Sequence, residues 1–399
     1  MSEMRIPFNK PALLGKEFEY VRRAIKRGKI SGDGHFTKLC QELLKRKTGA
    51  ASVLLTTSCT HALEMAALLL DIQPGDEVIV PSFTFVSTAN AFVLRGARPV
   101  FIDSRPDTLN VDEEQIEAHL TERTKAIVPV HYAGVGCEMD RIMEISQRRG
   151  IPVVEDNAHG LFGSYRGRQL GTFGSMATQS FHETKNISCG EGGALLMNDP
   201  KFIDRAEIIR EKGTNRANFF RGQVDKYTWV DLGSSYAPSD VLAAFLYAQL
   251  KSSERIQDAR RAIWWRYFRE LAGWAAEHGI PLPKIPAECE QAYHMFYLLM
   301  PSLEDRQAFI QHLGAHGILS VFHYVPLHLA PMGRKFGGKK GDCPVAEAVS
   351  ERLVRLPFYF DLSQSDQEQV IKAICAFHPA GSPWVAAQPG QPLHAMHRQ

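Results

Sequence analysis

The sequence has few of the features that mark membrane, secreted or nucleic-acid-binding proteins. It contains no run of about 18 apolar residues, so no membrane-spanning helix is predicted. Residues 1–5 have no apolar segment behind them, and we therefore expect no signal peptide. Lysine and arginine number 46 against 44 aspartate and glutamate residues, a net charge of +2. This balance provides no general field for nucleic acid or an anionic membrane, so an anionic partner must be bound locally.

Metal and nicotinamide signatures are also missing. The seven cysteines are scattered and form no C-x-x-C pair, which argues against a disulfide framework or a zinc site and for reduced thiols in a cytoplasmic protein. His182-Glu183 is not followed by a histidine at position 186, as a zinc protease would require. Gly134-Val135-Gly136 is followed by Met139 where a dinucleotide-binding fingerprint has its third glycine. No metal ligands are therefore predicted, and a dehydrogenase is disfavoured.

A regular alternation of short apolar runs and helix-like segments is present. Runs rich in Val, Ile and Leu, without polar alternation, indicate strands buried on both faces, and their alternation with helices predicts a mostly parallel α/β sheet. Because the later runs follow one another without long helices, we expect one antiparallel pair. The runs predicted to form this seven-stranded sheet are Ser52–Thr56, Glu77–Pro81, Pro99–Asp103, Ala126–His131, Pro152–Asp156, Ala177–Phe181 and Gly193–Asn198.

The pattern changes in the second half of the chain. An aromatic and charged segment, Gly213–Ser235, is predicted to be a loop, and a long helical stretch follows it. Met295–Met300 and Leu319–Tyr324 are predicted strands of a second unit. We therefore expect a large cofactor-binding domain over residues 1–250 and a small C-terminal α+β domain over residues 251–378. The tail, residues 379–399, has no periodicity and is expected to be disordered.

Polar residues follow three of the predicted strands, at the sheet edge where ligands bind in open parallel sheets. Ser58, Cys59 and Thr60 begin a helix whose free N–H groups suit a phosphate, and simple N-capping is the alternative. Asp156 ends a buried strand, where it could hold a cationic ring nitrogen or only cap a turn. Lys185 follows a later strand, although most lysines are solvated surface charges.

The three groups together match what pyridoxal phosphate (PLP) requires. The aldehyde of PLP needs an amine, its pyridinium needs an anion and its phosphate needs N–H donors. Lys185, Asp156 and the helix that starts at Ser58 would supply one of each. The glycines at positions 190, 192 and 193 allow close backbone approach, and the aromatic segment Ser82–Phe85 could cover a flat ring. We therefore predict that Lys185 forms a Schiff base with PLP.

A set of motifs spread over the chain resembles those of the DegT/StrS sugar-nucleotide aminotransferases. The resemblance extends from Ile6 to Phe377. It implies the type I PLP-dependent aminotransferase fold, and it is strongest to the enzymes that convert TDP-4-keto-6-deoxyglucose to TDP-4-amino-4,6-dideoxygalactose. The motifs are Ile6-Pro7-Phe8-Asn9-Lys10-Pro11, Gly32-Asp33-Gly34, Pro81-Ser82-Phe83-Thr84-Phe85, Val154-Glu155-Asp156, Ser180-Phe181-His182-Glu183-Thr184-Lys185, Gly190-Glu191-Gly192-Gly193 and His323-Tyr324-Val325-Pro326-Leu327-His328.

The resemblance assigns a role to each cofactor-binding candidate. It implies that Lys185 holds the cofactor and later moves the proton, and that Asp156 pairs with the pyridine nitrogen. Phe85 is expected to stack on the ring. His159 stands where the family often has glutamine, near the ring hydroxyl, although a histidine there could also be only a satisfied polar residue. The phosphate is expected to bind to Ser58, Cys59, Thr60 and Ser180.

The resemblance further implies a homodimer with active sites shared between subunits. A neighbouring subunit usually adds an asparagine from a G-x-N-x-R pattern. The matching stretch here, Gly233–Ala237, has Ser235 in place of the asparagine and Ala237 in place of the arginine. Ser235 is therefore the candidate for the phosphate contact from the partner.

Substrate contacts are expected from two further segments. Arg221, Lys226 and Tyr227 lie in a stretch where cations stand beside aromatics, and we expect them to bind the diphosphate or base of a nucleotide. A solvated loop with a packed aromatic anchor is the alternative. His323, Tyr324 and His328 are expected to line the sugar pocket, or else to pack and hydrogen-bond within a turn.

The expected reaction is a ping-pong transamination. L-Glutamate is expected to be the amino donor and TDP-4-keto-6-deoxy-D-glucose the acceptor, giving TDP-4-amino-4,6-dideoxy-D-galactose. Lys185 argues against the related dehydratases, which carry histidine at this position. A gluco-configured product, a 3-amino sugar transaminase and a non-catalytic PLP-binding regulator remain as alternatives, because no motif determines how the sugar lies over the cofactor.

Overall fold

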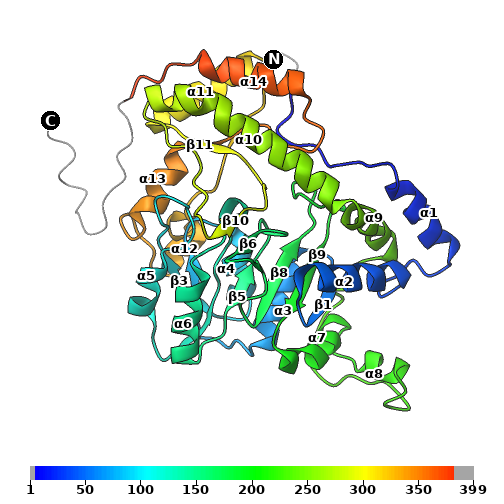
Figure 1. Ribbon diagram of the computed structural model, residues 1–399. Coiled ribbons are helices and arrows are strands. Elements are labelled where there is room, and N and C mark those ends of the chain that lie inside the picture. Colours follow the sequence, from blue (N-terminus) through cyan, green and yellow to red (C-terminus); the bar gives the residue numbers. More distant parts are fainter. Residues whose placement is uncertain (1–4, 382–399) are drawn as a thin grey trace.

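The computed structural model describes residues 5–381, and a sheet lies at its centre (Figure 1). The sheet has seven strands. A four-stranded part and a three-stranded part are joined by bridges from Ile127 to Val153 and from Val130 to Asp156. All strands are parallel except β9, which pairs antiparallel with β1 and β8. In spatial order they are β1 (Ser52–Thr56), β9 (Gly193–Met197), β8 (Met176–Ser180), β5 (Val154–Asp156), β4 (Thr124–Ile127), β2 (Glu77–Pro81) and β3 (Arg98–Ile102).

Each predicted strand run overlaps one of these strands, with shifts at the ends. The largest difference is in β4, which ends at Ile127 although the sequence predicted a strand to His131. Pro129 interrupts the ladder because it has no N–H to donate, although its carbonyl still accepts from the Asp156 N–H at 2.9 Å. The chain therefore continues beside β5 in strand-like pairing that is not regular.

The strands are buried on both faces because helices cover each side. In β1, Leu54 packs toward one group of helices, while Val53 and Leu55 pack toward the other. The first group contains α3 (Cys59–Leu69), α4 (Val86–Val93) and α7 (Ile203–Arg210). The second contains α2 (His35–Thr48), α6 (Met139–Arg149) and α9 (Asp240–Lys251), and α1 (Glu17–Lys26) packs on α9. This arrangement explains the continuous apolar runs in the sequence.

Shorter helices and strands are attached to this large α/β unit. Helix α5 (Glu113–Ile116) is followed by a 3-10 turn, Glu117–His119. The segment 213–235, predicted to be a loop, contains the short helix α8 (Arg216–Phe220), and Figure 1 shows this segment projecting from the body. A second small sheet is formed by β6 (Ser164–Tyr165), β7 (Arg168–Gln169) and β10 (Cys289–Glu290).

The C-terminal part has its own core. Helix α10 (Ser253–Glu277) crosses from α9 toward this part, where α11 and α14 lie (Figure 1). Its three-stranded sheet has the order β11 (Tyr297–Leu299), β13 (Leu353–Arg355) and β12 (Val321–Phe322), and its remaining helices are α11 (Leu303–Ala315), α12 (Pro331–Lys335), α13 (Pro344–Arg352) and α14 (Gln364–Cys375). The fold is therefore the expected large α/β unit with a small α+β domain.

The boundary between the two units has a simple structural marker. Helix α9 ends at Lys251 and α10 begins at Ser253, so we propose that the large domain ends near residue 250, as the sequence predicted. Ile6, in contrast, packs in the core of the small domain and bridges to Ile318, so the first described residues cross back to it. The expected tail lies, from residue 382 onward, outside the described residues. Among residues 5–381, no helix has the length and apolar character that a membrane crossing needs.

Candidate active site

A cavity of about 520 Å³ opens at the carboxyl ends of the sheet strands, between the sheet and the small domain. Its wall combines residues from loops that follow β1, β2, β5 and β8 with residues of the C-terminal unit. The predicted site residues that line it are Ser58, Cys59, Thr60, Phe85, Asp156, His159, Ser180, Lys185, His323 and Tyr324. Segments far apart in the sequence therefore meet at one place, where the topology of an open α/β sheet puts a ligand.

Lys185 reaches this cavity from a tight loop after β8. Its backbone N–H donates to the His182 carbonyl at 2.9 Å, and the neighbouring Asn186 side chain donates to the Ala292 carbonyl at 2.6 Å. Burial lowers the pKa of Lys185 to about 8, and the positive charge of Arg355 acts in the same direction, while the Asp156 carboxylate opposes the shift. A lysine with this pKa is partly neutral near pH 8, as a nucleophile or base must be.

Asp156 ends β5 and presents a buried carboxylate to the same cavity. Thr88 Oγ1 donates to its Oδ2 at 2.7 Å, and the Ala158 N–H donates to its Oδ1 at 3.2 Å. Burial raises the pKa of Asp156 above its ordinary value, although these hydrogen bonds and the charge of Lys185 oppose that shift. A protonated ring nitrogen is the partner that such a carboxylate can bind in a dry site.

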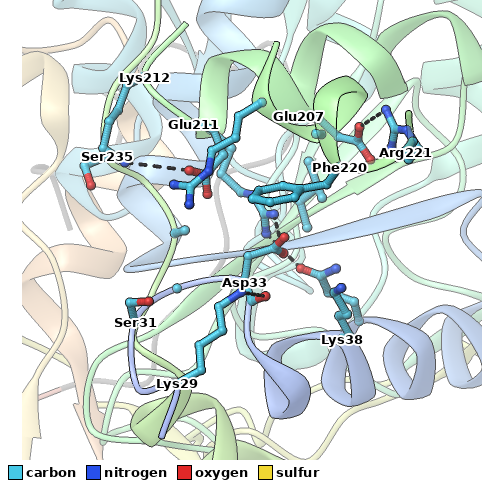
Figure 2. Close-up of a pocket in the computed structure, with 17 residues that line it drawn as sticks. Lys29, Ser31, Asp33, Lys38, Glu207, Glu211, Lys212, Phe220, Arg221 and Ser235 are labelled. Carbon is cyan, nitrogen blue, oxygen red and sulfur yellow. Dashed lines mark hydrogen bonds and ion pairs between the residues drawn. The ribbon is translucent and has the colours of Figure 1, made fainter. Parts of the chain in front are cut away.

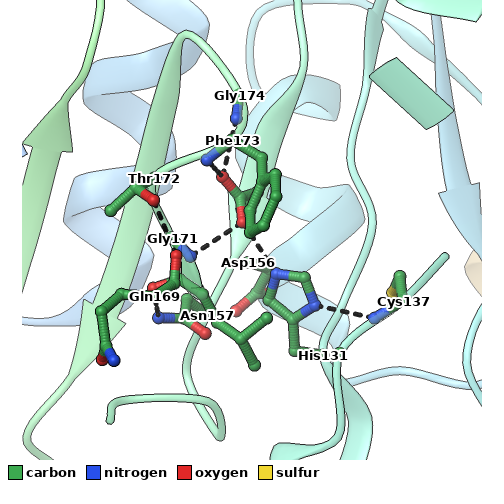
Figure 3. Close-up of polar contacts among 12 residues, drawn as sticks. His131, Cys137, Asp156, Asn157, Gln169, Gly171, Thr172, Phe173 and Gly174 are labelled. Carbon is green, nitrogen blue, oxygen red and sulfur yellow. Dashed lines mark hydrogen bonds and ion pairs between the residues drawn. The ribbon is translucent and has the colours of Figure 1, made fainter. Parts of the chain in front are cut away.

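The preceding residue, Glu155, is fully buried, does not line the cavity and anchors β5. Figure 3 shows His131, Gly171, Phe173 and Gly174, whose N–H groups bind its carboxylate. The Cys137 N–H donates to His131 Nδ1 at 3.2 Å, so His131 Nε2 carries a hydrogen and donates to the Glu155 carboxylate at 2.9 Å. Because consecutive strand residues face opposite sides, fixing Glu155 also fixes the direction of Asp156. The carboxylate accepts further from backbone N–H groups of Gly171 (2.8 Å), Phe173 (2.7 Å) and Gly174 (2.7 Å).

The N-terminus of α3 forms a cradle for an anion. Ser58 caps the helix by accepting from the His61 N–H at 3.1 Å. Over residues 5–381, the N–H groups of Cys59 and Thr60 have no protein acceptor, and they lie at the positive end of the helix dipole. Strand β9 starts directly beneath: a Cβ on Gly193 would lie 2.3 Å from the Ser58 carbonyl carbon. Only glycine fits there, and this explains one of the glycines after Lys185.

His159 leaves one polar atom without a protein partner. Its buried ring stacks on His294, with centroids 4.2 Å apart and planes 19° apart. Within the part of the chain that the structure describes, its Nδ1 is buried and makes no hydrogen bond. Burial lowers the pKa of His159 well below its ordinary value, so the ring is neutral. An unpartnered nitrogen beside Lys185 and Asp156 suits the ring hydroxyl of PLP, and this atom, the anion cradle and the carboxylate together fit the cofactor.

The small domain closes the opposite wall. His323 and Tyr324 stack with ring centroids 3.5 Å apart, and Tyr132 is hydrogen-bonded to His323 Nδ1 at 2.7 Å. Two residues that the sequence interpretation missed, His294 and Arg355, also line this wall. A signal for Arg355 was present, because it interrupts the apolar run from Leu353 to Leu356, whereas His294 had none.

His328 does not line the cavity, contrary to the prediction. It is fully buried and hydrogen-bonded on both ring nitrogens, to Ser82 Oγ at 2.6 Å and to Glu347 Oε1 at 3.0 Å. The left-handed backbone at Tyr324 (φ 47°) turns the chain after the two lining residues and carries His328 behind the wall. The alternative interpretation, a histidine satisfied within a turn, is therefore the one that the structure shows.

Ser235 and Arg221 lie in a second cavity of about 600 Å³, shown in Figure 2 and called here the basic pocket. Its walls come from the residues before α2, from α7 and from the segment around α8. Arg221 pairs with Glu207 at 2.7 Å there. Lys226 and Tyr227 follow in the same projecting segment, with Tyr227 exposed at its surface. The basic side chains that line the pocket are Lys29, Lys38, Arg210, Lys212, Arg216 and Arg221.

Comparison with known proteins identifies the family to which this chain belongs. The chain matches the DegT/DnrJ/EryC1/StrS aminotransferase family over residues 12–375. It belongs to that family. The spore coat polysaccharide biosynthesis protein SpsC of Bacillus subtilis is 32% identical over 380 residues, which cover 92% of this chain and 96% of SpsC. The aminotransferase TlmJ from Streptoalloteichus hindustanus is 33% identical, with a TM-score of 0.85 over 93% of this chain and 98% of TlmJ.

A further solved structure bears on the cofactor. Spr1654 from Streptococcus pneumoniae is 28% identical, and its form with pyridoxamine phosphate (PMP) has a TM-score of 0.86 over 93% of this chain and 98% of that one. A PLP form of the same protein is also similar. The protein is thus a PLP-dependent aminotransferase of a sugar aminotransferase family, and the predicted fold class, enzyme class and cofactor are confirmed.

Proposed function

We propose that the enzyme transfers the amino group of L-glutamate to TDP-4-keto-6-deoxy-D-glucose and forms TDP-4-amino-4,6-dideoxy-D-galactose. The observation that carries the proposal is the meeting of Lys185 and Asp156 in one cavity whose far wall, with His323 and Tyr324, comes from the small domain. The motifs around these residues most resemble enzymes of that substrate class. We further propose a cytoplasmic homodimer.

Lys185 is the proton carrier in this proposal. When bound, PLP withdraws electrons from the carbon that bears the exchanging amine. Lys185 Nζ, which is neutral above its pKa of about 8, would take the proton from that carbon and deliver it to the cofactor carbon bonded to the same nitrogen, and the second half-reaction would run in reverse. Asp156, held by Thr88, keeps a proton on the ring nitrogen.

The remaining cofactor contacts orient the ring. The Cys59 and Thr60 N–H groups and the hydroxyls of Ser58 and Ser180 hold the phosphate at the start of α3. His159 Nδ1 binds the ring hydroxyl. Phe85, whose side chain is 56% exposed at the cavity, covers the ring face and excludes water from it.

We propose that the basic pocket and the exposed segment beside it bind the nucleotide of the partner subunit's substrate. Arg216 and Lys38 have no carboxylate partner among the described residues, and Arg216 lies over the rings of Phe220 and Tyr227 at 5.2 and 5.9 Å. Cations beside aromatic rings suit a diphosphate joined to a base. Ser235, in the same pocket, would reach the partner's cofactor phosphate.

This assignment predicts the effect of two substitutions. Arg221→Ala and Lys226→Ala are expected to raise KM for the sugar nucleotide several-fold and to leave KM for glutamate unchanged. Arg269→Ala, which removes an exposed arginine from α10, serves as the control. An unchanged KM for the sugar nucleotide in both variants would remove these residues from the nucleotide site.

The reaction itself is tested by incubating the enzyme with TDP-4-keto-6-deoxyglucose and L-glutamate and identifying the product by NMR. The proposal predicts an amine at C4 in the axial, galacto configuration, together with 2-oxoglutarate. An equatorial amine would indicate the gluco product, and an amine at C3 would indicate a 3-amino sugar transaminase. If PLP is retained but glutamate produces no PMP, glutamate would not be the amino donor.

A further inference from the structure

Arg355 is a half-buried arginine in the wall of the active-site cavity. It ends β13, the central strand of the small sheet, and faces Tyr297 of β11 and Val321 of β12 in the register. Its neighbours Leu353 and Val354 are buried in hydrophobic cores. The side chain is therefore held on a rigid element and is directed at the cavity that contains Lys185.

The guanidinium of Arg355 has no anionic partner. Across residues 5–381 it makes no hydrogen bond or ion pair, its Nε is buried without an acceptor, and its guanidinium carbon lies 4.6 Å from the centre of the Phe8 ring. Arg260, buried nearby, differs, because it donates to the carbonyls of Tyr293 at 2.9 Å and His294 at 2.6 Å. A cation with a buried donor that has no partner is costly, and a ligand that brings an anion would remove that cost.

The groups around Arg355 do not neutralise it. Burial lowers the pKa values of His159, His294 and His323 well below the ordinary range, and the charge of Arg355 contributes to each of these shifts. Burial also lowers the pKa of Arg355 itself, but a guanidinium stays charged in proteins. This side of the cavity is therefore positive.

The two carboxylates that line the cavity are engaged elsewhere. Asp156 accepts hydrogen bonds from Thr88 and Ala158. Glu191 lies 3.6 Å from His182 Nε2 with its side chain largely exposed. An anion for Arg355 must therefore come with a ligand.

We propose that Arg355 binds the α-carboxylate of the amino donor. In an amino acid this carboxylate is attached to the carbon that bears the exchanging amine, so it must lie close to Lys185 during transfer. A keto-sugar has no anion at its reacting carbon, and its diphosphate is attached on the far side of the hexose ring. A single fork-shaped cation matches one carboxylate, whereas the several cations of the basic pocket match a diphosphate. This assignment rests on the proposed function only in requiring an amino-acid donor.

The two half-reactions separate this role from a structural one. The first is measured by mixing the PLP enzyme with L-glutamate and following the loss of the cofactor's visible band, and the second by mixing the PMP enzyme with the keto-sugar nucleotide. Arg355→Met is expected to lower the efficiency of the first half-reaction at least about 30-fold and to change the second less than about 3-fold. Arg355→Lys should recover part of the loss. Arg352→Met, at the end of α13 and outside the cavity wall, is the matched control.

A substrate-side measurement keeps the test decisive even if Arg355→Met folds poorly. The wild-type enzyme should react with L-isoglutamine, whose α-carboxylate is an amide, far more slowly than with L-glutamate, and more slowly than with L-glutamine. Arg355→Lys should discriminate less between glutamate and isoglutamine. Equal rates with both donors in the wild type, or an equal loss in both half-reactions of Arg355→Met, would overturn the proposal. An enzyme that fails only with the TDP-sugar would instead contradict the proposed function, because the glutamate half-reaction needs no sugar.

Discussion

The buried Glu155 carboxylate provides a quantitative test of how Asp156 is held in place. Its Oε1 accepts from the N–H groups of Phe173 and Gly174, and its Oε2 accepts from Gly171 and His131. Glu155→Gln replaces one of these oxygens by an NH₂ group. The two N–H groups that donate to that oxygen would then face another donor, and both hydrogen bonds would be lost. Hydrogen bonds to a charged group contribute about 1.5–3 kcal/mol each, so the substitution should lower the free energy of unfolding by about 3–6 kcal/mol.

The assay is urea unfolding of the PLP-saturated enzyme, with the wild type and the variant at the same PLP concentration because ligand binding adds to stability. Glu144→Gln is the control, since Glu144 pairs with Arg141 on an exposed surface, and its effect should stay within about 0.5 kcal/mol. If Glu155→Gln also changed the free energy of unfolding by less than about 1 kcal/mol, the carboxylate would not be the anchor of β5 that its hydrogen bonds indicate.

Three further predictions concern cofactor loading and catalysis. Asp156→Asn should lower kcat at least about 100-fold, as loss of an electrostatic contact in an active site does, and wild-type kcat in this variant would exclude the ring-nitrogen role. The rate at which apo enzyme takes up PLP should rise with pH with a midpoint near 8 and level off above it, because the lowered pKa of Lys185 makes its amine increasingly neutral over that range; a midpoint near the ordinary lysine value of 10.5 would contradict the burial argument. Gly193→Ala should weaken PLP binding because its Cβ would meet the Ser58 backbone, whereas Gly273→Ala in α10, with open space around it, should not, and equal PLP affinity in the two variants would refute the cradle.

The large-domain sheet could be predicted because several of its strands, such as β1, β2 and β9, consist mainly of consecutive apolar residues, and such runs form where helices cover both faces. The exceptions have local causes, such as the missing N–H of Pro129 that ends β4 early. Helices α1 and α2 were not predicted, because both pack on α9, which lies about 200 residues later in the sequence. The pairing of Ile6 with Ile318 is similarly non-local, and no pattern in either segment indicates it.

The candidate site divides in the same way. Residues at strand ends and at the start of α3 could be placed because the sheet topology determines where they meet. His323 and His328 belong to one motif, yet they face different surroundings, because the backbone turn at Tyr324 is a feature of the fold. His294 reaches the cavity only through the packing of the small domain. The role of Ser235 depends on a partner subunit, which one chain cannot supply.

The most direct test of the central assignment is reduction of the PLP enzyme with borohydride, followed by peptide mapping by mass spectrometry. Reduction makes the bond between the cofactor and its lysine permanent, so the labelled residue identifies the attachment site. The structure predicts that the label lies on Lys185 alone, and that Lys185→Ala takes up none. A label on any other lysine, or an unchanged label in Lys185→Ala, would contradict the account.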